Sequence, residues 1–129
     1  MAEKKRILVV DDEPDFASIV QGHLEKEGFE VEFAYDGVEG MGKVKAHPPD
    51  AIILDVMMPE MDGYKMCSLL KEDAAYRDIP IVLLTAVSSH ISSTRYSHHG
   101  GMTTEADDYL DKPASAEDIT DSIKRLLNL

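Results

Sequence analysis

The sequence predicts an α/β fold with a five-stranded parallel sheet. Short apolar runs alternate with longer segments in which apolar residues recur every three or four positions, which is the pattern of strands followed by amphipathic helices. Two of the runs, 7–10 and 51–54, are continuously apolar, as expected of strands that are buried on both faces of a parallel sheet. Turn residues and prolines separate the runs, and they set the expected boundaries.

The first half of the chain contains three predicted strands and two predicted helices. A strand over 6–10 precedes a helix that begins near Pro14 and ends at Gly28. Polar and apolar residues alternate over 30–34, which indicates a half-exposed strand at a sheet edge. A short helix follows Asp36-Gly37, and a third strand ends at Asp55. The expected inner faces are Phe16, Ile19, Val20 and Leu24 in the first helix, and Val38, Met41 and Val44 in the second.

The second half continues the alternation with one irregular segment. A third helix presents Met66, Leu69 and Leu70, and a strand over 81–84 ends at Thr85. Residues 88–104 are rich in Ser, Thr, His and Gly, so we expect the fourth helix to be irregular or shortened. A short strand over 108–110 precedes the last helix. Ser115 caps that helix, and its apolar stripe is Ile119, Ile123, Leu126 and Leu127.

Composition and length limit the classes of function. A chain of 129 residues corresponds to one domain, 1–129. The formal net charge of −12 argues against direct binding to nucleic acid, which requires clustered Lys and Arg. No apolar run is long enough to span a membrane, and the N-terminus does not resemble a signal peptide. A single cysteine, Cys67, fits a reducing compartment, and we expect a cytoplasmic protein.

Five polar residues fall at predicted strand ends. Because the carboxyl ends of parallel strands share one edge of a sheet, these residues should meet there. They are Asp11, Asp12, Asp55, Thr85 and Lys112. Clustered carboxylates repel one another and require a cation, and oxygen ligands without His or Cys favour Mg²⁺ or Mn²⁺. Lys112 and Thr85 offer a charge and a hydroxyl to the oxygens of a phosphoryl group.

The motifs that contain these residues resemble those of response-regulator receiver domains. The similar segments are Asp11-Asp12, 54–63, Thr85-Ala86 and 106–113, and the resemblance extends over essentially the whole chain. It implies a flavodoxin-like, doubly wound sheet with strand order 2-1-3-4-5. It also implies a two-component signalling switch that catalyses only its own phosphorylation and dephosphorylation, controlled by a sensor histidine kinase or phosphotransfer protein and acting on a downstream protein target or output domain.

The resemblance further implies a role for each site residue. Asp55 would accept the phosphoryl group, and Asp11, Asp12, Asp55 and the backbone carbonyl of Met57 would bind Mg²⁺. Thr85 and Lys112 would hold the phosphoryl oxygens. Thr85 and Tyr109 would form the conformational switch, although Tyr109 also fits the pattern of an ordinary half-buried strand residue.

Two other functions fit parts of the sequence. A Mg²⁺-dependent phosphohydrolase of the haloacid-dehalogenase type also uses an aspartyl nucleophile, but it usually carries a second acid two residues later, where this chain has Met57. A phosphorylation-independent interaction domain would not need the full set of acids, Thr85 and Lys112. Met57 and Val87 lack groups that orient water, so we expect slow self-dephosphorylation.

Overall fold

In the computed structural model, which describes residues 4–56, 61–86, 106–112 and 115–129, five parallel strands form one sheet. The strands are β1 (Arg6–Val10), β2 (Glu30–Ala34), β3 (Ala51–Asp55), β4 (Ile81–Ala86) and β5 (Asp108–Lys112), in the order β2-β1-β3-β4-β5. The described helices are α1 (Pro14–Lys26), α2 (Gly37–Ala46), α3 (Gly63–Glu72) and α5 (Ala116–Leu126). The predicted fold class and strand order are confirmed, whereas the expectation of an irregular fourth helix falls at 88–104, outside the described residues.

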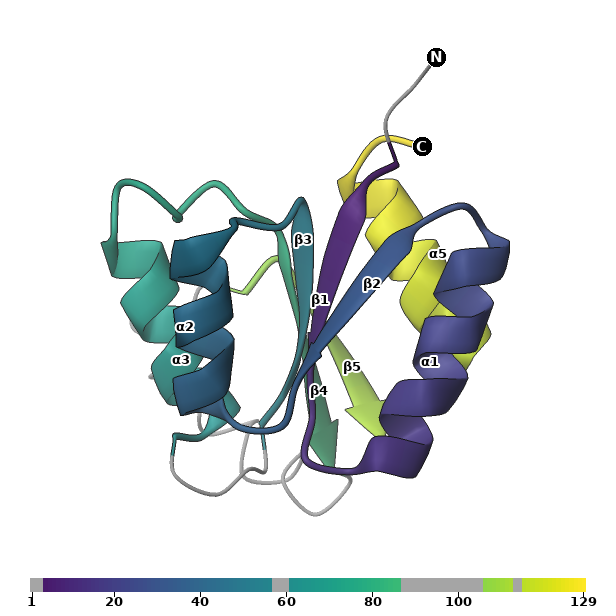
Figure 1. Cartoon of the computed structure of the whole chain (residues 1–129), viewed down its shortest axis with the longest axis horizontal. Helices are drawn as coiled ribbons and strands as arrows, with labels where there is room; N and C mark the ends of the chain where they lie inside the picture. The colour runs from purple at the N-terminus through teal and green to yellow at the C-terminus, as the bar shows by residue number, and fades with distance from the viewer. Residues whose placement is uncertain (1–3, 57–60, 87–105, 113–114) are drawn as a thin grey trace.

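The helices cover both faces of the sheet (Figure 1). Helices α1 and α5 lie on one face, and α2 and α3 lie on the other. Two apolar clusters fill the layers between helices and sheet, and the central strands contribute to both because their alternate residues point to opposite faces. This explains why β1 and β3 are continuously apolar in the sequence.

None of the helices in the described parts of the chain combines the length and the apolar character needed to cross a membrane.

Two expected inner-face residues are wrong. Ile19 is 64% exposed and Val38 is 57% exposed. The buried residues of the two helices are Ala17, Val20 and Leu24 in α1, and Gly37, Gly40 and Val44 in α2. A Cβ atom on Gly40 would lie 3.0 Å from the terminal methyl of Met66, so the glycine allows α2 and α3 to pack closely. The inner face of α2 therefore combines the predicted Val44 and Met41 with two glycines that the apolar pattern did not identify.

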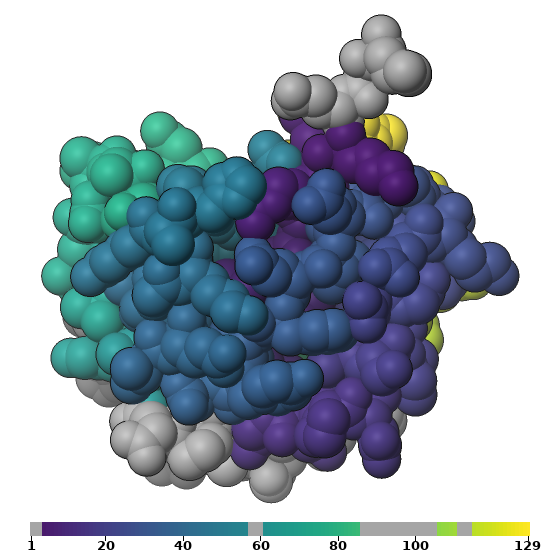
Figure 2. All heavy atoms as spheres, viewed as in Figure 1, coloured from purple at the N-terminus to yellow at the C-terminus, as the bar shows by residue number. Residues whose placement is uncertain are grey.

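The predicted edge position of 30–34 is confirmed, because β2 ends the sheet. Backbone bonds to β1 use the N–H of Glu30 and the C=O of Ala34, so the groups of residues 31, 33 and 35 point away from the sheet. Helix α2 covers part of this edge: Lys43 donates to the carbonyl of Phe33, and Glu39 accepts from the N–H of Tyr35 at 2.8 Å. Figure 2 shows α2 and β2 together on the front surface of the molecule.

A mostly buried lysine joins α3 to the start of β5. The Lys71 ammonium donates to the carbonyls of Arg77 and Ile79 at 2.9 and 3.0 Å, and to Asp107 Oδ2 at 2.9 Å. The same Asp107 oxygen accepts from the N–H of Ile81 at 2.8 Å. One cation therefore connects the turn after α3, the first residue of β4 and the residue before β5.

The last helix begins and packs as predicted. Ser115 Oγ accepts from the N–H of Asp118 at 3.0 Å, which satisfies one of the donors left free at a helix N-terminus. Ile119 and Ile123 are fully buried. Ser122 also donates to Asp108 Oδ2 at 2.5 Å, so α5 is bonded to β5 as well as packed against the sheet.

Candidate functional site

The ends of β1 and β3 bring two buried carboxylates to one edge of the sheet. Asp11 follows β1 and its N–H donates to the carbonyl of Ala34 at 3.0 Å, which extends the pairing with β2 by one residue. Asp55 is the last residue of β3. Their exposed fractions are 0% and 2%. Figure 1 shows this edge at the bottom of the view, where the arrows of β4 and β5 also end.

Four carboxylates converge at this edge. One oxygen each of Asp11, Asp12, Glu13 and Asp55 lies within 4.8 Å of the others. Asp11 and Asp55 are buried, whereas Asp12 and Glu13 are exposed. Burying like charges together is costly unless a cation compensates them. Four oxygen donors, without His or Cys in the group, suit a hard divalent cation such as Mg²⁺ that keeps part of its water shell.

Glu13 belongs to this group but was not among the predicted site residues. Its N–H donates to Asp11 Oδ1 at 2.9 Å, so the chain turns tightly between β1 and α1 and brings the next carboxylate back toward Asp11. Pro14 then occupies the first turn of α1. The sequence signal that could have identified Glu13 is its position directly after the acidic pair and before a proline that begins a helix.

Thr85 lies beside Asp55 in the sheet. Asp55 is paired with Leu84 across β3 and β4, and Thr85 follows directly. The N–H of Val56 donates to the carbonyl of Leu84 at 3.0 Å, so the two strands stay paired beyond Asp55. Thr85 is only 3% exposed. A buried hydroxyl is thus present on the strand next to the carboxylates.

Of the other predicted site residues, Lys112 is described by its backbone, and Met57 lies outside the described residues. Lys112 is the last residue of β5, and its backbone is in register with Ala86 of β4, one residue beyond Thr85. Its strand end therefore lies at the same edge as the carboxylates, while its side chain is not among the described parts. Met57 falls in 57–60, outside the described residues.

Tyr109 lies at the side of the site, on the face of the sheet that carries α3. It is in register with Leu83, which belongs to the same apolar cluster as Met66 and Cys67 of α3. The residue is 48% exposed. Burial of its phenol raises the pKa of Tyr109 above the ordinary value, and the nearby Cys67 thiol adds to the effect. The side chain is thus about half exposed, on the face of the sheet that α3 covers.

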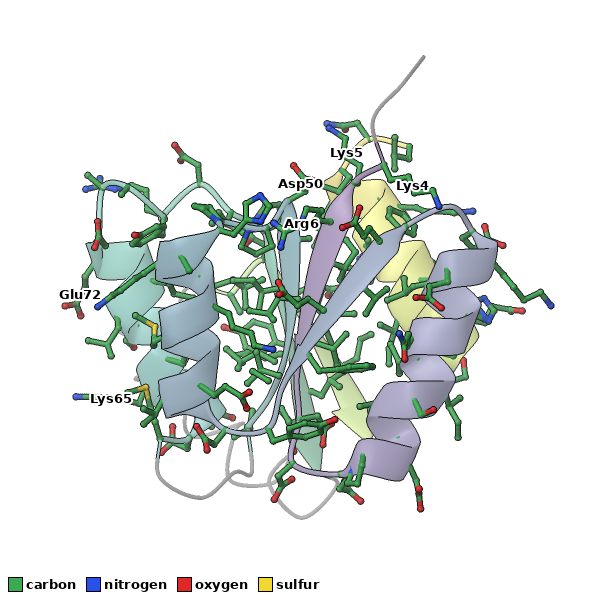
Figure 3. All side chains as sticks on the ribbon, in the orientation of Figure 1. Lys4, Lys5, Arg6, Asp50, Lys65 and Glu72 are labelled. Carbon is green, nitrogen blue, oxygen red and sulfur yellow. The ribbon has the colours of Figure 1, made fainter. Side chains whose placement is uncertain are left out.

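A concave region lies at the end of the sheet opposite the carboxylates. It has a volume of about 250 Å³ and is lined by Arg6, Val31, His47 and two glutamates. Figure 3 shows Arg6 and Asp50 at this end. The Arg6 guanidinium already donates to Glu32 at 2.8 Å and to the carbonyl of His47 at 3.2 Å. Its hydrogen bonds are used within the fold, and it is remote from the carboxylates.

Comparison with known proteins gives one consistent family. The family model described as "Response regulator receiver domain" matches residues 7–124. The transcriptional regulator RpaA of Synechocystis, described as DNA-binding, is 36% identical over 122 residues, which cover 95% of this chain and 48% of that protein. The chain spans about half the length of the curated relatives it matches.

Solved structures agree with this result. The receiver domain of a signal transduction histidine kinase from Syntrophus aciditrophicus has a TM-score of 0.85 and 36% identity, and the match covers 96% of this chain and 90% of that domain. The chemotaxis response regulator CheY4 of Vibrio cholerae has a TM-score of 0.83 and 30% identity, with coverage of 96% and 99%. Similar domains thus occur in proteins of different kinds.

Proposed function

The chain belongs to the response regulator receiver domain family, and from that membership we propose that Asp55 is its phosphoacceptor. The observation that carries the proposal is the convergence of Asp55 with three other carboxylates at the carboxyl edge of the sheet. Asp55 is the acid that stands at a central strand end, and it is 2% exposed, so a phosphoryl group bound there is held within the fold.

The chemistry requires little of the protein beyond position and charge. An Asp55 carboxylate oxygen attacks the phosphorus of a phosphohistidine, the P–O bond forms as the P–N bond breaks, and the imidazole leaves with the electron pair and takes up a proton. The Thr85 hydroxyl, on the neighbouring strand, donates to one phosphoryl oxygen, and Lys112 neutralises another. The product is an aspartyl phosphate.

The carboxylates fit the Mg²⁺ that receiver domains generally bind. Asp11, Asp12 and Asp55, together with the backbone carbonyl of Met57, would hold Mg²⁺ or Mn²⁺, and Glu13 adds charge beside them. When bound, the metal would neutralise charge on the transferring phosphoryl group. The protein's part is to hold these oxygens close together before the metal arrives.

Phosphorylation would change the conformation of Thr85 and Tyr109. When the Thr85 hydroxyl turns toward the phosphate, it leaves space beside β4, and the half-exposed Tyr109 ring moves inward on the α3 side. This changes the surface around β5. The switch rests on these two residues, and the chain acts on itself rather than on a small substrate.

The partners follow from the same reaction. A sensor histidine kinase or a phosphotransfer protein supplies the phosphoryl group in the cytoplasm, and a protein target or an output domain responds to it. Relatives such as RpaA are about twice as long as the matched region and are described as DNA-binding. With a net charge of −12, this domain is not the part that we expect to contact nucleic acid.

Incubation with acetyl phosphate and Mg²⁺, followed by intact-mass spectrometry, tests the proposal. We expect one phosphoryl group on the wild-type chain and none on Asp55→Asn, whereas Asp78→Asn, an exposed acid in the turn after α3, behaves as wild type. Continued turnover of phosphate esters would instead support the phosphohydrolase alternative. After removal of the donor, slow loss of the adduct would agree with Met57 and Val87 lacking water-orienting groups.

A further inference from the structure

Helix α3 begins in direct contact with the backbone of Asp55. Gly63 is the first residue of α3. A Cβ atom built on it would lie 2.4 Å from the carbonyl oxygen of Asp55 and 2.8 Å from the Cα of Val56. Both distances are far below van der Waals contact, and both partners are backbone atoms. Only a glycine allows the helix to approach the acceptor strand this closely.

The Asp55–Val56 backbone cannot move away easily, because hydrogen bonds hold it on two sides. The N–H of Val56 donates to Leu84 of β4 at 3.0 Å, and the carbonyl of Val56 accepts from the N–H of Gly63 at 3.1 Å. A side chain at 63 would therefore push the residues around Asp55 against β4 or detach the start of α3. Either movement shifts Asp55 relative to Asp11 and Thr85.

A second glycine makes a similar close contact with the segment that connects β3 to α3. Gly37 is the first residue of α2, and a Cβ atom built on it would lie 2.5 Å from the carbonyl oxygen of Met61 and 2.7 Å from the Met61 Cβ. Val56 and Met61 flank residues 57–60, the segment that contains Met57. The described residues on both sides of this segment are thus fixed by a glycine at a helix start.

We propose that Gly63 and Gly37 are positioning residues for the phosphoacceptor site. By carrying no side chain, they allow α3 and α2 to fix the backbone on either side of 57–60, which sets the Asp55 carboxylate against Asp11 and Asp12 for metal binding and attack. The inference rests on the proposed role of Asp55, and it assigns the geometry of that site to two residues that touch neither metal nor phosphate.

The chain provides matched controls for the substitution of glycine by alanine. Among the described residues, nothing beyond the local helix backbone lies within 4 Å of a Cβ built on Gly42 in α2 or Gly22 in α1, so alanine fits there. Gly40 is close only to side chains, with Met66 Cε at 3.0 Å and Val10 Cγ2 at 3.2 Å, so alanine there perturbs packing away from the acceptor backbone. Since alanine is a better helix former than glycine, loss at Gly63 would not come from propensity.

The experiment measures Mg²⁺ affinity by calorimetry, the initial rate of phosphorylation by acetyl phosphate, and the thermal unfolding midpoint. For Gly63→Ala and Gly37→Ala we expect Mg²⁺ affinity and phosphorylation rate to fall about 10- to 100-fold, because small displacements of reacting groups have effects of this size. Gly42→Ala and Gly22→Ala should match wild type. Gly40→Ala should unfold at lower temperature but retain its Mg²⁺ affinity, which separates positioning from stability.

A folded Gly63→Ala with wild-type Mg²⁺ affinity and rate would overturn the inference. If that variant does not fold, the same measurements on Gly37→Ala decide. The wild-type chain offers a further test, since the amide resonance of Gly63 should shift on saturation with Mg²⁺ while that of Gly42 stays in place; an unmoved Gly63 resonance contradicts the inference. If the wild type binds Mg²⁺ but Asp55 is not phosphorylated, the proposed function is wrong. The Mg²⁺ affinities of the glycine variants then still test whether the two glycines position the carboxylates.

Discussion

The ionisation of Tyr109 depends on how far its phenol is buried. Burial, with help from Cys67, raises the pKa of its phenol in the folded protein. The unfolded chain therefore releases this proton at lower pH than the folded chain does. The contribution of Tyr109 to stability is complete below its unfolded pKa of about 10 and is lost as pH rises through the folded value.

An alkaline titration followed by tyrosinate absorbance tests both the pKa and the switch. We expect Tyr109→Phe to remove a component that titrates above pH 10, the ordinary value. With Mg²⁺ and beryllofluoride as a phosphoryl mimic, that component should move to still higher pH, because the ring becomes more buried. Tyr35→Phe, which alters the exposed aromatic after β2, should leave this response intact. An unchanged Tyr109 titration would contradict inward movement of the ring.

At the same scale, the sequence predicted the buried acids but not all of their neighbours. Asp11 and Asp55 were predictable because apolar runs identify strands, and the first polar residue after such a run lies at the sheet edge. Glu13 was missed because its position depends on a turn that an Asp11 oxygen stabilises. The role of Gly63 depends on a distance between a helix and a strand, which spacing along the chain does not encode.

Lys71 links elements that are distant in the sequence, and its removal should destabilise the whole domain. Its side chain is 9% exposed and donates to Asp107 and to two carbonyls. Lys71→Met keeps the aliphatic stem but removes the ammonium donor from all three acceptors, of which Asp107 keeps its bond from the N–H of Ile81. We expect the free energy of unfolding to fall by about 2–4 kcal/mol.

Urea unfolding followed by circular dichroism measures this difference. Lys65→Met is the matched control, because Lys65 is exposed on the same helix and points into solvent (Figure 3). We expect that control to change the free energy by less than about 0.5 kcal/mol. If the two variants have equal free energies of unfolding, the hydrogen bonds of Lys71 stabilise the fold no more than hydrogen bonds to water stabilise the unfolded chain.

At the scale of elements, the pattern of apolar residues predicted the described strands and helices and most of the residues that face the sheet, with two exceptions. Ile19 and Val38 were expected inside because they are large and apolar, yet both are exposed. The inner faces combine the predicted Val20, Leu24 and Val44 with small residues that were not predicted, since close packing of a helix on its neighbours also favours small side chains. The small residues are Ala17, Gly37 and Gly40. A hydrophobicity pattern gives these residues little weight.

For the molecule as a whole, the acidic group makes stability depend on divalent metal. A ligand that binds only the folded state raises the free energy of unfolding by about 2.7 kcal/mol when its concentration is 100 times its dissociation constant. We expect Mg²⁺ to stabilise the wild type by this amount in urea unfolding, and chelation to reverse it. Asp12→Asn should show a smaller response at the same Mg²⁺ concentration, and an equal response would exclude Asp12 from the site.

Whole-molecule architecture was the part that the sequence predicted best. The parallel sheet follows from the alternating pattern, and the strand order and the family follow from the resemblance of a few strand-end motifs; the family model spans 7–124. What remained beyond prediction were distances set by packing, such as the approach of α2 to Met61. These distances determine how accurately the residues of the proposed phosphoacceptor site are positioned.

The covered edge of β2 has a consequence for the protein at high concentration. An exposed edge strand can pair with an edge from another molecule and begin ordered aggregation. Here Lys43 and Glu39 of α2 already bond to the outward groups of Phe33 and Tyr35, and they place charges beside the strand. Joining another strand at β2 would have to displace both contacts, so this edge of the sheet is protected against pairing with a second copy.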